Sequence, residues 1–433
     1  MCGLAELLHN MGARVTGSDQ SENQQTERLR EMGIVISHNH KPENLGDSEV
    51  VVYSSAIKPS NPEYAAARAR RIPLIPRAEA LAEMMRLKRG IGVAGTHGKT
   101  TTTSLVASVF LSAGQDPTIV VGGRLDMIKS TAQLGKGEWL IAESDESDGS
   151  FNRLSPEIVI ITNIDNDHLD HYKTFENLQN AFFDFAWRIP FYGAAIVYGD
   201  DPEVRKVFES FGKRIWFYGT DRVNDVVVAK VDQGYSLEVE GKMLGTFKPA
   251  LPGLHNALNS TAAIMAGMEA GLTFDQCRKG IEEFKGVDRR FQWKNKVGAV
   301  DFYDDYGHHP TEIEAVLKGF KEHYPKRKIV VAFRPHRYSR TKICYEQFLT
   351  SFKDADQLFL MDIYAAGESS IEGIDSKSLA AKIQHGNCTH WQETRDPSLS
   401  KIVAALTGDA VFVTLGAGDV WKLNVKVQKA LAK

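Results

Sequence analysis

Residues 91–103 read Ile-Gly-Val-Ala-Gly-Thr-His-Gly-Lys-Thr-Thr-Thr-Thr. An apolar run precedes the glycines and a helix-length segment follows them to Gly114, which predicts a buried strand, a tight turn and a helix. Backbone N–H groups in such a turn and at the start of the helix suit an anion. The Lys99 ammonium suits the β- and γ-phosphates of a nucleotide, and the Thr100 hydroxyl suits Mg²⁺. We therefore expect this segment to bind a nucleoside triphosphate.

This phosphate loop differs from the common pattern, which has a glycine where Val93 stands. Gly95 and Gly98 supply the turn instead. The alternative is an ordinary strand-to-helix turn that contains Gly-Lys-Thr by chance, but the preceding strand and the four threonines favour a phosphate loop. We expect Lys99 to be an exposed loop residue whose charge matters only when phosphate is present.

The overall composition is that of an ordinary globular protein, with 42% hydrophobic and 25% charged residues in a chain of 433. That length predicts three domains. The net charge of −3 offers no bulk attraction to nucleic acid or to an anionic membrane. No apolar run approaches the ~20 residues of a membrane-spanning helix, and the start of the chain has no signal-peptide layout. The four cysteines lack metal-binding spacing, so we expect reduced thiols in a cytoplasmic protein.

Residues 1–88 predict a parallel α/β domain. Residues 4–8 have the spacing of a helix interior, and residues 13–19 read as a strand that ends in Asp19. An acidic residue at this place often holds a ribose hydroxyl in dinucleotide-binding folds. The strand and Gly-rich turn that should precede the helix are absent, so we expect a Rossmann-like domain that lacks its first strand.

Residues 89–294 predict a central domain that contains the phosphate loop. One strand runs into Glu143-Ser-Asp-Glu-Ser-Asp, and the next runs into an Asp-rich segment that contains His168. Because Mg²⁺ prefers oxygen ligands, we expect the acidic loop to hold this ion and His168 to reach a second one. The alternatives are a solvated loop and a structural histidine. Residues 214–248 alternate like antiparallel strands, which predicts a mixed sheet.

Two asparagines stand three residues apart at the start of a predicted helix, Asn256 and Asn259. On one helix face their amides could contact an adenine edge. The alternative is a helix cap, which is a common role for asparagine at such a position.

Residues 295–433 alternate strand and helix, which predicts a C-terminal Rossmann-like domain. Two of its strand ends carry chemically active residues, at 303–310 and at 334–340. Ligands of such sheets lie beyond the carboxyl ends of the strands, and paired arginines suit carboxylate or phosphate.

Five motifs together resemble the Mur ligases, the ATP-dependent amide-forming enzymes of peptidoglycan synthesis. They are Gly-Thr-His-Gly-Lys-Thr-Thr at 95–101, Glu-Ser-Asp-Glu-Ser-Asp at 143–148, Thr-Asn-Ile with Asp-His-Leu-Asp at 162–170, His-Asn-Ala-Leu-Asn at 255–259 and Asp-Arg-Arg-Phe at 288–291. The segments at 304–310 and 334–340 narrow the resemblance to the activity that joins L-alanine to the lactyl carboxylate of UDP-N-acetylmuramate. The resemblance implies ATP and two divalent ions (Mg²⁺ or Mn²⁺) as cofactors, and a monomer or weak homodimer without nucleic acid or membrane partners.

The resemblance also implies a role for each matching residue. The residues with an implied catalytic role are Lys99, Glu143, His168 and His308. The residues implied to bind metal are Thr100, Glu143 and His168. ATP binding falls to Gly95, Thr96, His97, Gly98, Lys99, Thr100, Thr101, Asn256, Asn259, Arg289 and Asp304. Substrate binding falls to Ser18, Asp19, Ser54, Ser55 and Arg77 for the UDP-sugar, and to Tyr306, His309, Arg337 and Arg340 for the amino-acid and acyl-phosphate side.

The chain departs from the family pattern at two places. Several sister ligases carry a carbamylated lysine after the metal-binding histidine, but residues 181–185 contain no lysine, so we expect no carbamate. Family members also have a strand and a Gly-rich loop before the residues seen here as Met1, Cys2 and Gly3. We therefore expect weaker binding of the UDP-sugar than by a chain extended upstream, while ATP binding should hardly change.

Three other functions compete with this interpretation. One is a recycling ligase that attaches a ready-made tripeptide to the same nucleotide sugar, and another is a folylpolyglutamate synthetase-like enzyme. The Tyr-Gly pair at 306–307 favours the alanine-adding activity. The third is a nucleotide sensor without chemistry, against which the intact Lys99, Glu143, His168 and Arg289 argue.

Overall fold

The computed structural model describes residues 1–433 except 55, 126, 129 and 433. The chain forms two compact units. Unit 1 contains residues 1–250 and 257–285, and unit 2 contains residues 251–256 and 286–433. Both are α/β structures, as the sequence predicts. The predicted domain boundary at residue 294 lies inside a strand of unit 2, because residues 292–297 pair with the strand that follows them.

The N-terminal part of unit 1 contains two small parallel sheets. The first pairs β1 (Thr16–Asp19) with β2 (Val35–His38), and the second pairs β3 (Val51–Tyr53) with β4 (Leu74–Pro76). The helices are α1 (Cys2–Asn10), α2 (Gln24–Glu31), the 3₁₀ turn η1 (Pro42–Leu45), α3 (Pro62–Ala69) and α4 (Arg77–Met85). Helix α1 packs against β7 (Ser130–Gln133) of the large central sheet, where a Cβ on Gly3 would lie 2.9 Å from the Ala132 Cβ.

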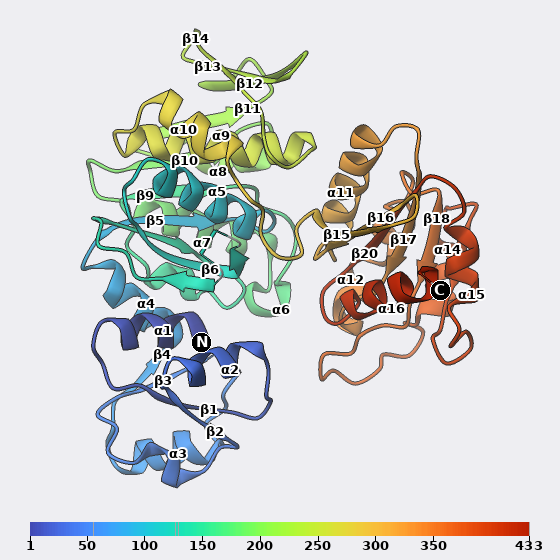
Figure 1. The fold of residues 1–433 in the computed structure, drawn as a ribbon. Coiled ribbons are helices and arrows are strands. Elements are labelled where there is room, and N and C mark those ends of the chain that lie inside the picture. Colours follow the sequence, from blue (N-terminus) through green and yellow to red (C-terminus); the bar gives the residue numbers. More distant parts are fainter. Residues whose placement is uncertain (55, 126, 129, 433) are drawn as a thin grey trace. The chain divides into compact units, whose positions relative to one another are not determined.

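The central sheet of unit 1 has ten described strands (Figure 1). Their order is β14 (Lys242–Phe247), β13 (Gly234–Val239), β12 (Val226–Val231), β11 (Ile215–Gly219), β10 (Ala194–Tyr198), β9 (Ile158–Ile161), β5 (Arg89–Ala94), β8 (Trp139–Glu143), β6 (Thr118–Leu125) and β7 (Ser130–Gln133). In this spatial order, the seven strands from β12 through β5 to β6 are parallel to one another, whereas β7, β13 and β14 pair antiparallel with their neighbours. The sheet is therefore mixed, as predicted. The prediction of antiparallel strands throughout 214–248 is wrong for β11, which extends the parallel sheet beside β10.

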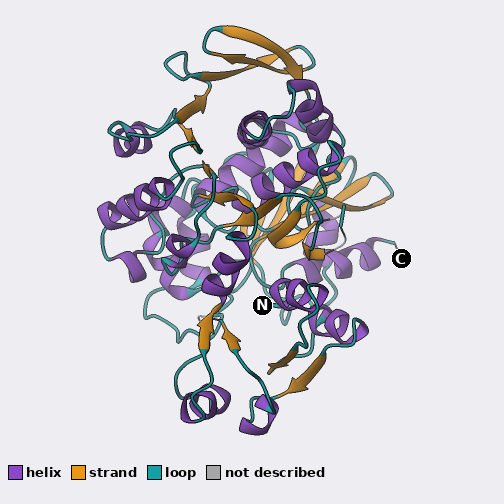
Figure 2. Ribbon diagram, turned by 90° about the vertical axis from the view of Figure 1, so that its left-hand side faces the viewer, coloured by secondary structure: helices purple, strands orange, loops and turns teal. Residues whose placement is uncertain are grey.

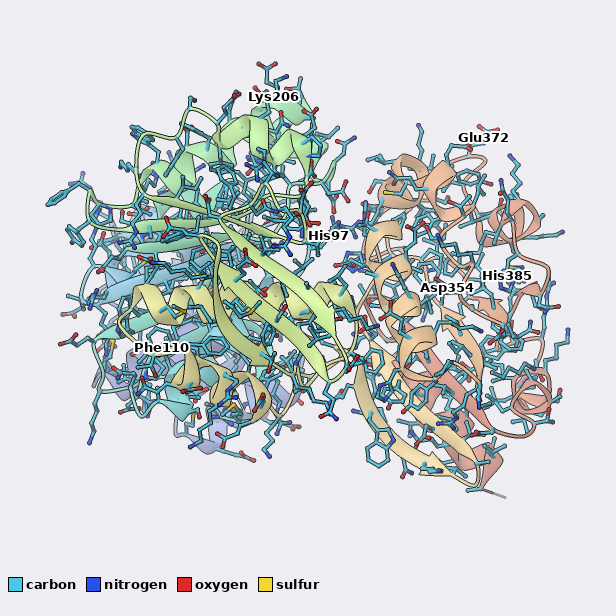
Figure 3. The ribbon with its side chains drawn as sticks, turned by 90° about the horizontal axis from the view of Figure 1, so that it is seen from above. His97, Phe110, Lys206, Asp354, Glu372 and His385 are labelled. Atoms are coloured by element: carbon cyan, nitrogen blue, oxygen red, sulfur yellow. The ribbon has the colours of Figure 1, made fainter. Side chains whose placement is uncertain are left out.

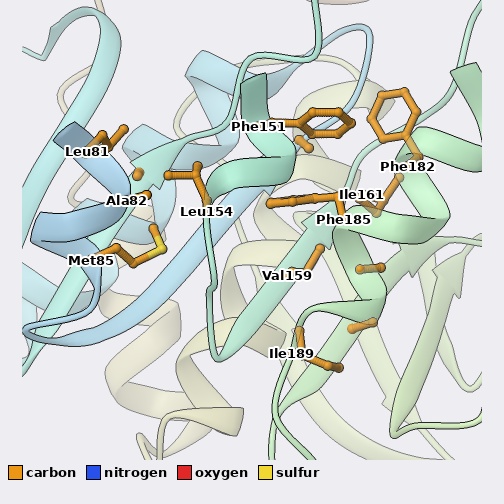
Figure 4. Packing of buried hydrophobic residues seen from close by; sticks show 14 of the residues in the cluster. Leu81, Ala82, Met85, Phe151, Leu154, Val159, Ile161, Phe182, Phe185 and Ile189 are labelled. Atoms are coloured by element: carbon orange, nitrogen blue, oxygen red, sulfur yellow. The ribbon is translucent and has the colours of Figure 1, made fainter. Parts of the chain in front are cut away.

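Helices cover both faces of this sheet. On one face, α5 (Lys99–Ser112), α9 (Leu254–Glu269) and α10 (Phe274–Glu282) meet closely, since Cβ atoms on Gly267 and Gly280 would lie within 3.0 Å of Val109. The other face carries α4, α7 (Phe175–Trp187) and α8 (Pro202–Phe208). There Phe151, Phe182 and Phe185 pack on strand β9 (Figure 4). Burial of this large aromatic area fixes β9 beside β5, which carries the phosphate loop.

The described residues of unit 2 form a six-stranded sheet with helices on both faces. Figure 2 distinguishes the helices of the chain from its strands by colour. The strand order is β15 (Gln292–Val297), β16 (Val300–Asp305), β20 (Ala410–Leu415), β17 (Lys328–Phe333), β18 (Gln357–Leu360) and β19 (Cys388–His390). Only β15 runs antiparallel among these. The helices are α11 (Pro310–His323), α12 (Tyr338–Ile343), α13 (Tyr345–Phe348), α14 (Ser376–Lys382), α15 (Ser400–Ala405) and α16 (Trp421–Leu431).

Alternate residues of the unit 2 strands enter two separate cores. Tyr303 and Val331 join the layer that contains Phe320 of α11, whereas Phe302 and Val330 join the layer that contains Val427 of α16. Strands buried on both faces are nearly continuous apolar runs, which is why they are recognisable in the sequence.

Candidate active site

The phosphate loop joins the end of β5 at Ala94 to the start of α5 at Lys99. Gly95 and Gly98 have φ values of 138° and 82°, which favour glycine. A Cβ on Gly95 would also lie only 2.0 Å from Thr162 Oγ1. Both glycines are therefore required by the backbone of the loop.

The segment that follows β9 holds the loop in place. The Thr96 hydroxyl oxygen accepts a hydrogen bond from the Asp165 N–H at 2.9 Å, and the His97 N–H donates to Asn163 Oδ1 at 2.9 Å. His97 Nε2 lies 3.0 Å from Asp165 Oδ2. Figure 3 labels His97 in this loop and Phe110 towards the far end of α5. Thr96 and His97 thus fix the loop to a neighbouring strand end.

Lys99 is turned back into the loop. Its Nζ donates to the carbonyl oxygens of Gly95 at 2.6 Å and Thr96 at 3.1 Å, and to Glu146 Oε1 at 2.9 Å. Its side chain is 14% exposed and that of Glu146 is fully buried. The expectation of an exposed Lys99 is therefore wrong, because a carboxylate from the acidic loop pairs with it inside the site.

The charges of Lys99 and Glu146 depend on each other. Burial alone would lower the pKa of Lys99, but the negative charges of Glu146 and Asp145 outweigh burial and raise this pKa. Burial raises the pKa of Glu146 to about 7, against the stabilising charge of Lys99. The ammonium therefore stays charged while its partner carboxylate is held at a cost of desolvation.

Thr100 and Glu143 form a second pair beside the first. The Thr100 hydroxyl donates to Glu143 Oε1 at 3.0 Å, and the Gly122 N–H donates to Glu143 Oε2 at 2.6 Å. A hydroxyl and a carboxylate side by side at the phosphate loop are oxygen donors of the kind that Mg²⁺ uses together with substrate phosphates. The donor set fits a magnesium ion.

The acidic loop divides into two kinds of carboxylate. Asp145 Oδ1 accepts from the Ser147 N–H at 3.1 Å, and Asp148 Oδ1 accepts from the Ser150 N–H at 3.0 Å, so both shape local turns. Glu143 and Glu146 instead contact side chains of the phosphate loop and of α5. The candidate metal and phosphate chemistry of this loop therefore rests on its two glutamates.

His168 lies in the same cluster. It has a φ of 58° and precedes the short helix α6 (Leu169–Tyr172). Its Nε2 is 3.6 Å from Glu146 Oε1 and 3.7 Å from Asp167 Oδ2. The structure thus brings both His168 and Lys99 close to one buried carboxylate, that of Glu146.

The predicted adenine contacts have different surroundings. Asn259 is buried, and a Cβ on Gly98 would lie 3.1 Å from its Oδ1, so its amide lies against the phosphate loop. Asn256 donates from Nδ2 to the Pro252 carbonyl oxygen at 2.7 Å, which is not the acceptor geometry of a helix cap. Thr101 is buried in the first turn of α5.

In unit 2, Arg289 and Asp304 pair with each other. Arg289 Nε donates to Asp304 Oδ2 at 2.8 Å, and its two terminal nitrogens donate to the carbonyl oxygens of Gly418 at 2.9 Å and Gly416 at 2.6 Å. Burial raises the pKa of Asp304, although Arg289 opposes this. The pair fastens the loop at 286–291 to the carboxyl ends of β16 and β20.

The segment after β16 is held by a carboxylate that the sequence motifs do not single out, Asp305. Its side chain accepts from the N–H groups of Phe291 and Gly307, both at 2.7 Å. Tyr306 stacks near Arg289, whose guanidinium carbon is 4.9 Å from the ring centroid. The adjacent aspartates in the Asp-Asp-Tyr sequence are the available signal, but nothing in it separates their roles.

His308 and His309 precede helix α11. Their N–H groups donate to Glu312 Oε2 at 2.9 and 3.2 Å, and His309 is buried at the N-cap position. His308 Nδ1 is 3.2 Å from the Tyr306 carbonyl oxygen. Burial lowers the pKa of His308 to about 3, so the imidazole is neutral near pH 7.

The arginine-rich segment lies at the carboxyl end of β17. Arg337 is exposed and has a φ of 69°, and its N–H donates to the Tyr364 carbonyl oxygen at 2.8 Å. Arg340 NH1 is 3.4 Å from Nδ1 of His336, whose ring lies 6.0 Å from that of His308. The structure therefore brings His308, His336 and Arg340 together at one sheet edge.

The predicted UDP-sugar residues lie in the first part of unit 1. The Ser18 hydroxyl donates to Glu63 Oε2 at 2.6 Å, and Asp19 Oδ1 accepts from the Ser21 N–H at 2.9 Å. Ser54 follows β3, and Arg77 is exposed at the start of α4. Ser55 lies outside the described residues. Ser18 and Asp19, Ser54 and Arg77 thus lie at the carboxyl ends of three strands, β1, β3 and β4. In the described residues they do not form one hydrogen-bonded cluster.

Comparison with known proteins covers nearly the whole chain. Residues 1–89 match the "Mur ligase family, catalytic domain" profile, residues 93–267 the "Mur ligase middle domain" and residues 289–418 the "Mur ligase, glutamate ligase domain". A UDP-N-acetylmuramate–L-alanine ligase of Bdellovibrio bacteriovorus is 58% identical over 100% of this chain and 96% of its own. The chain belongs to the Mur ligase family.

Two further relatives agree with this membership of the Mur ligases. A UDP-N-acetylmuramate–L-alanine ligase of Aquifex aeolicus is 42% identical over 98% of this chain and 93% of its own. The crystal structure of the Thermotoga maritima UDP-N-acetylmuramate–alanine ligase superposes with a TM-score of 0.82 at 26% identity, covering 99% of this chain and 96% of that one. The three-domain α/β fold of the Mur ligases is thus the fold of this chain. None of the helices in the described residues is long and apolar enough to cross a bilayer.

Proposed function

We propose that this Mur ligase joins L-alanine to the lactyl carboxylate of UDP-N-acetylmuramate, with conversion of ATP to ADP and phosphate, in cytoplasmic synthesis of peptidoglycan precursors. The names of the relatives at 58% and 42% identity support the choice of substrates. The observation that carries the chemistry is the cluster at the end of β5, in which Lys99 and the Thr100–Glu143 pair meet at one phosphate loop.

The first step is phosphoryl transfer from ATP to the lactyl carboxylate, which gives an acyl phosphate and ADP. The glycines of the loop let backbone N–H groups face the phosphates, and Lys99 stabilises the charge of the transferring group. Phosphoryl transfer depends mainly on such positioning and electrostatics. In this proposal Thr96, His97 and Thr101 shape the loop rather than react.

Two divalent ions, Mg²⁺ or Mn²⁺, would be held by Thr100, Glu143 and His168. When bound, they supply positive charge to the phosphate oxygens and to the carboxylate that attacks. Glu143 keeps one oxygen anchored by the Gly122 N–H, so its other oxygen and the Thr100 hydroxyl are held ready for a ligand.

The second step is attack of the alanine amine on the acyl carbon, which releases phosphate and a proton. Because its pKa is about 3, His308 suits a catalytic role as a neutral hydrogen-bond acceptor that orients the attacking amine, while the released phosphate takes up the proton. Its Nδ1 faces the Tyr306 carbonyl oxygen, and this contact favours the tautomer with Nδ1 protonated and Nε2 as the free base. Arg337 and Arg340 suit the amino-acid carboxylate and the acyl phosphate, and Tyr306 and His309 would shape that side.

The remaining residues are assigned to nucleotide and sugar. Asn259 lies beside the phosphate loop, which supports a role near ATP, and we assign Asn256, Arg289 and Asp304 to the same ligand. Ser18, Asp19, Ser54, Ser55 and Arg77 are assigned to the UDP-sugar.

Mass spectrometry of the product tests the proposal. The enzyme is incubated with ATP, Mg²⁺ and UDP-N-acetylmuramate, and with L-alanine, glycine, L-serine or the L-Ala–γ-D-Glu–meso-diaminopimelate tripeptide as the amine. We expect UDP-N-acetylmuramoyl-L-alanine as the main product when all amines compete. Preferential ligation of the tripeptide would assign the recycling activity instead, and ATP binding without any amide product would assign a sensor.

A further inference from the structure

Glu146 is the most deeply buried carboxylate of the site and the one to which the proposed mechanism gives no task. Its side chain has no exposed surface. Its backbone carbonyl oxygen accepts from the Tyr172 hydroxyl at 2.5 Å and from the Gly149 N–H at 2.9 Å, which fixes the turn that carries it. Its two carboxylate oxygens lie 2.8 and 2.9 Å from Lys99 Nζ, and its Oε1 lies 3.6 Å from His168 Nε2.

The hydrogen bonds of Lys99 show what this contact does. An ammonium group has three N–H donors, and here they meet the carbonyl oxygens of Gly95 and Thr96 and the carboxylate of Glu146. All three donors of Lys99 are thus directed to protein acceptors. A nucleotide phosphate can reach this ammonium only if it replaces one of these acceptors or shares a donor with it.

Charge decides which acceptor matters most. The two carbonyl oxygens are neutral, whereas Glu146 is a carboxylate whose side chain has no exposed surface, and a charged pair shielded from water interacts more strongly than one in water. A phosphate oxygen and the Glu146 carboxylate carry charges of the same sign and would accept hydrogen bonds from the same ammonium group, that of Lys99. Their simultaneous presence near Lys99 is therefore unfavourable.

We infer that Glu146 is a positioning residue that acts as an internal counter-anion of Lys99 and competes with the nucleotide phosphates for its ammonium group. In the empty site, Glu146 keeps Lys99 charged, hydrogen-bonded and directed into the loop. On nucleotide binding, the phosphates take over part of this interaction. The inference rests on the proposed nucleotide binding at the phosphate loop and adds a residue that tunes it.

Calorimetric titration with ADP in EDTA tests the inference, because the absence of divalent ions separates competition for Lys99 from metal binding. We expect Glu146→Gln to bind ADP at least about tenfold more tightly than wild type, since removal of the carboxylate leaves a buried cation that the phosphates can neutralise. We also expect its melting temperature without ligand to be lower and the increase caused by ADP to be larger. All titrations are run in the same buffer at the same pH, so that wild type and variants are compared directly.

Two further variants make the test specific. Asp148→Asn removes one negative charge from the same loop, at a side chain that caps the Ser150 N–H, and we expect nearly unchanged ADP affinity. In a Lys99→Ala background, Glu146→Gln should no longer tighten ADP binding, because the shared ammonium is gone. Glu146→Asp keeps the charge but draws it back from Lys99, so it should also bind ADP more tightly than wild type, and it replaces Glu146→Gln in the test if that variant folds poorly.

The outcomes are distinguishable. Weaker or equal ADP binding by Glu146→Gln, with wild-type binding intact, would overturn the role of Glu146 but leave the proposed function standing. The same tightening in the Lys99→Ala background would also overturn it, because the effect would then not pass through Lys99. Absence of ADP and ATP binding by the wild-type protein would overturn both the inference and the phosphate-loop assignment.

Discussion

The Thr100 hydroxyl donates to Glu143 Oε1 across 3.0 Å, and this contact joins the first turn of α5 to the carboxyl end of β8. The strands β5 and β8 are direct neighbours in the parallel sheet, so their carboxyl ends deliver both groups to one edge. The second Glu143 oxygen is held by the Gly122 N–H from β6. Three adjacent strands thus set the position of one carboxylate.

This geometry predicts the metal dependence of the enzyme. Glu143→Gln keeps an amide oxygen near Thr100 but removes the negative charge, so we expect the Mg²⁺ concentration for half-maximal activity to rise at least about tenfold. His168→Ala should have a smaller effect, because imidazole is a poorer partner for a hard cation. Titration of Mg²⁺ in an ADP-release assay measures both. Unchanged requirements in both variants, with Asp148→Asn as the charge-matched control, would contradict the metal assignment.

Gly95 offers a prediction about stability. Its φ is 138°, and a Cβ at this position would lie 2.0 Å from Thr162 Oγ1, so Gly95→Ala must move the loop or β9. We expect a loss of more than about 3 kcal/mol of unfolding free energy together with loss of ATP binding. Gly114→Ala is the control, since Gly114 has a φ of 74° with no neighbour within 4 Å and should cost only about 1–2 kcal/mol. Urea unfolding gives both values, and equal losses would show that steric contact with Thr162 is unimportant.

Much of this site is predictable from the sequence, and the reason is local. The strand, turn and helix at 91–103 are encoded by an apolar run, glycines and a following helical segment, so the loop and Lys99 can be placed without a structure. The partners of Lys99 cannot be predicted in this way. The acidic loop contains four carboxylates within six residues, and the sequence does not show which of them contacts the lysine. In the structure, Asp145 and Asp148 accept hydrogen bonds within local turns, whereas Glu146 contacts Lys99. The role of Asp305 cannot be predicted either, because its partners are backbone N–H groups, which every residue except proline has.

Lys99 itself gives a prediction with two parts. Lys99→Ala should slow ligation on the order of 10³-fold, because a main stabilising charge of phosphoryl transfer is lost. It should also destabilise the empty enzyme by about 3 kcal/mol, because Glu146 is left buried without its cation. In the double variant Lys99→Ala/Glu146→Gln most of this stability should return while activity stays low. Urea unfolding of the three variants measures the coupling, and additive losses would contradict the ion pair.

The buried His308 predicts a pH dependence of stability. Burial lowers its pKa in the folded protein to about 3, against 6.5 in the unfolded chain, so the unfolded state binds more protons between these values. The contribution of His308 to the free energy of unfolding should therefore be fully present above about pH 6.5. It should decrease as the pH falls towards 3, by at most about 1.4 kcal/mol per pH unit.

The variant His308→Gln should be less sensitive to acid than wild type over this range. Asp305 acts in the opposite direction, because burial raises its pKa to about 6 and its contribution to stability increases as the pH falls below that value. Comparison of variant and wild type cancels the Asp305 contribution. Denaturant unfolding at several pH values measures the difference, with the exposed His38→Gln as control. Parallel pH curves for wild type and His308→Gln would contradict the buried, neutral state of His308.

The most direct test of the proposed chemistry follows oxygen atoms. UDP-N-acetylmuramate labelled with ¹⁸O in both oxygens of its lactyl carboxylate is incubated with ATP, Mg²⁺, L-alanine and the enzyme, and the released phosphate is analysed by mass spectrometry. Transfer of the γ-phosphoryl group to the carboxylate, followed by attack of the amine on the acyl carbon, predicts one ¹⁸O atom in each phosphate and one retained in each amide. Phosphate without label, or ADP release that does not require UDP-N-acetylmuramate, would contradict an acyl-phosphate ligase.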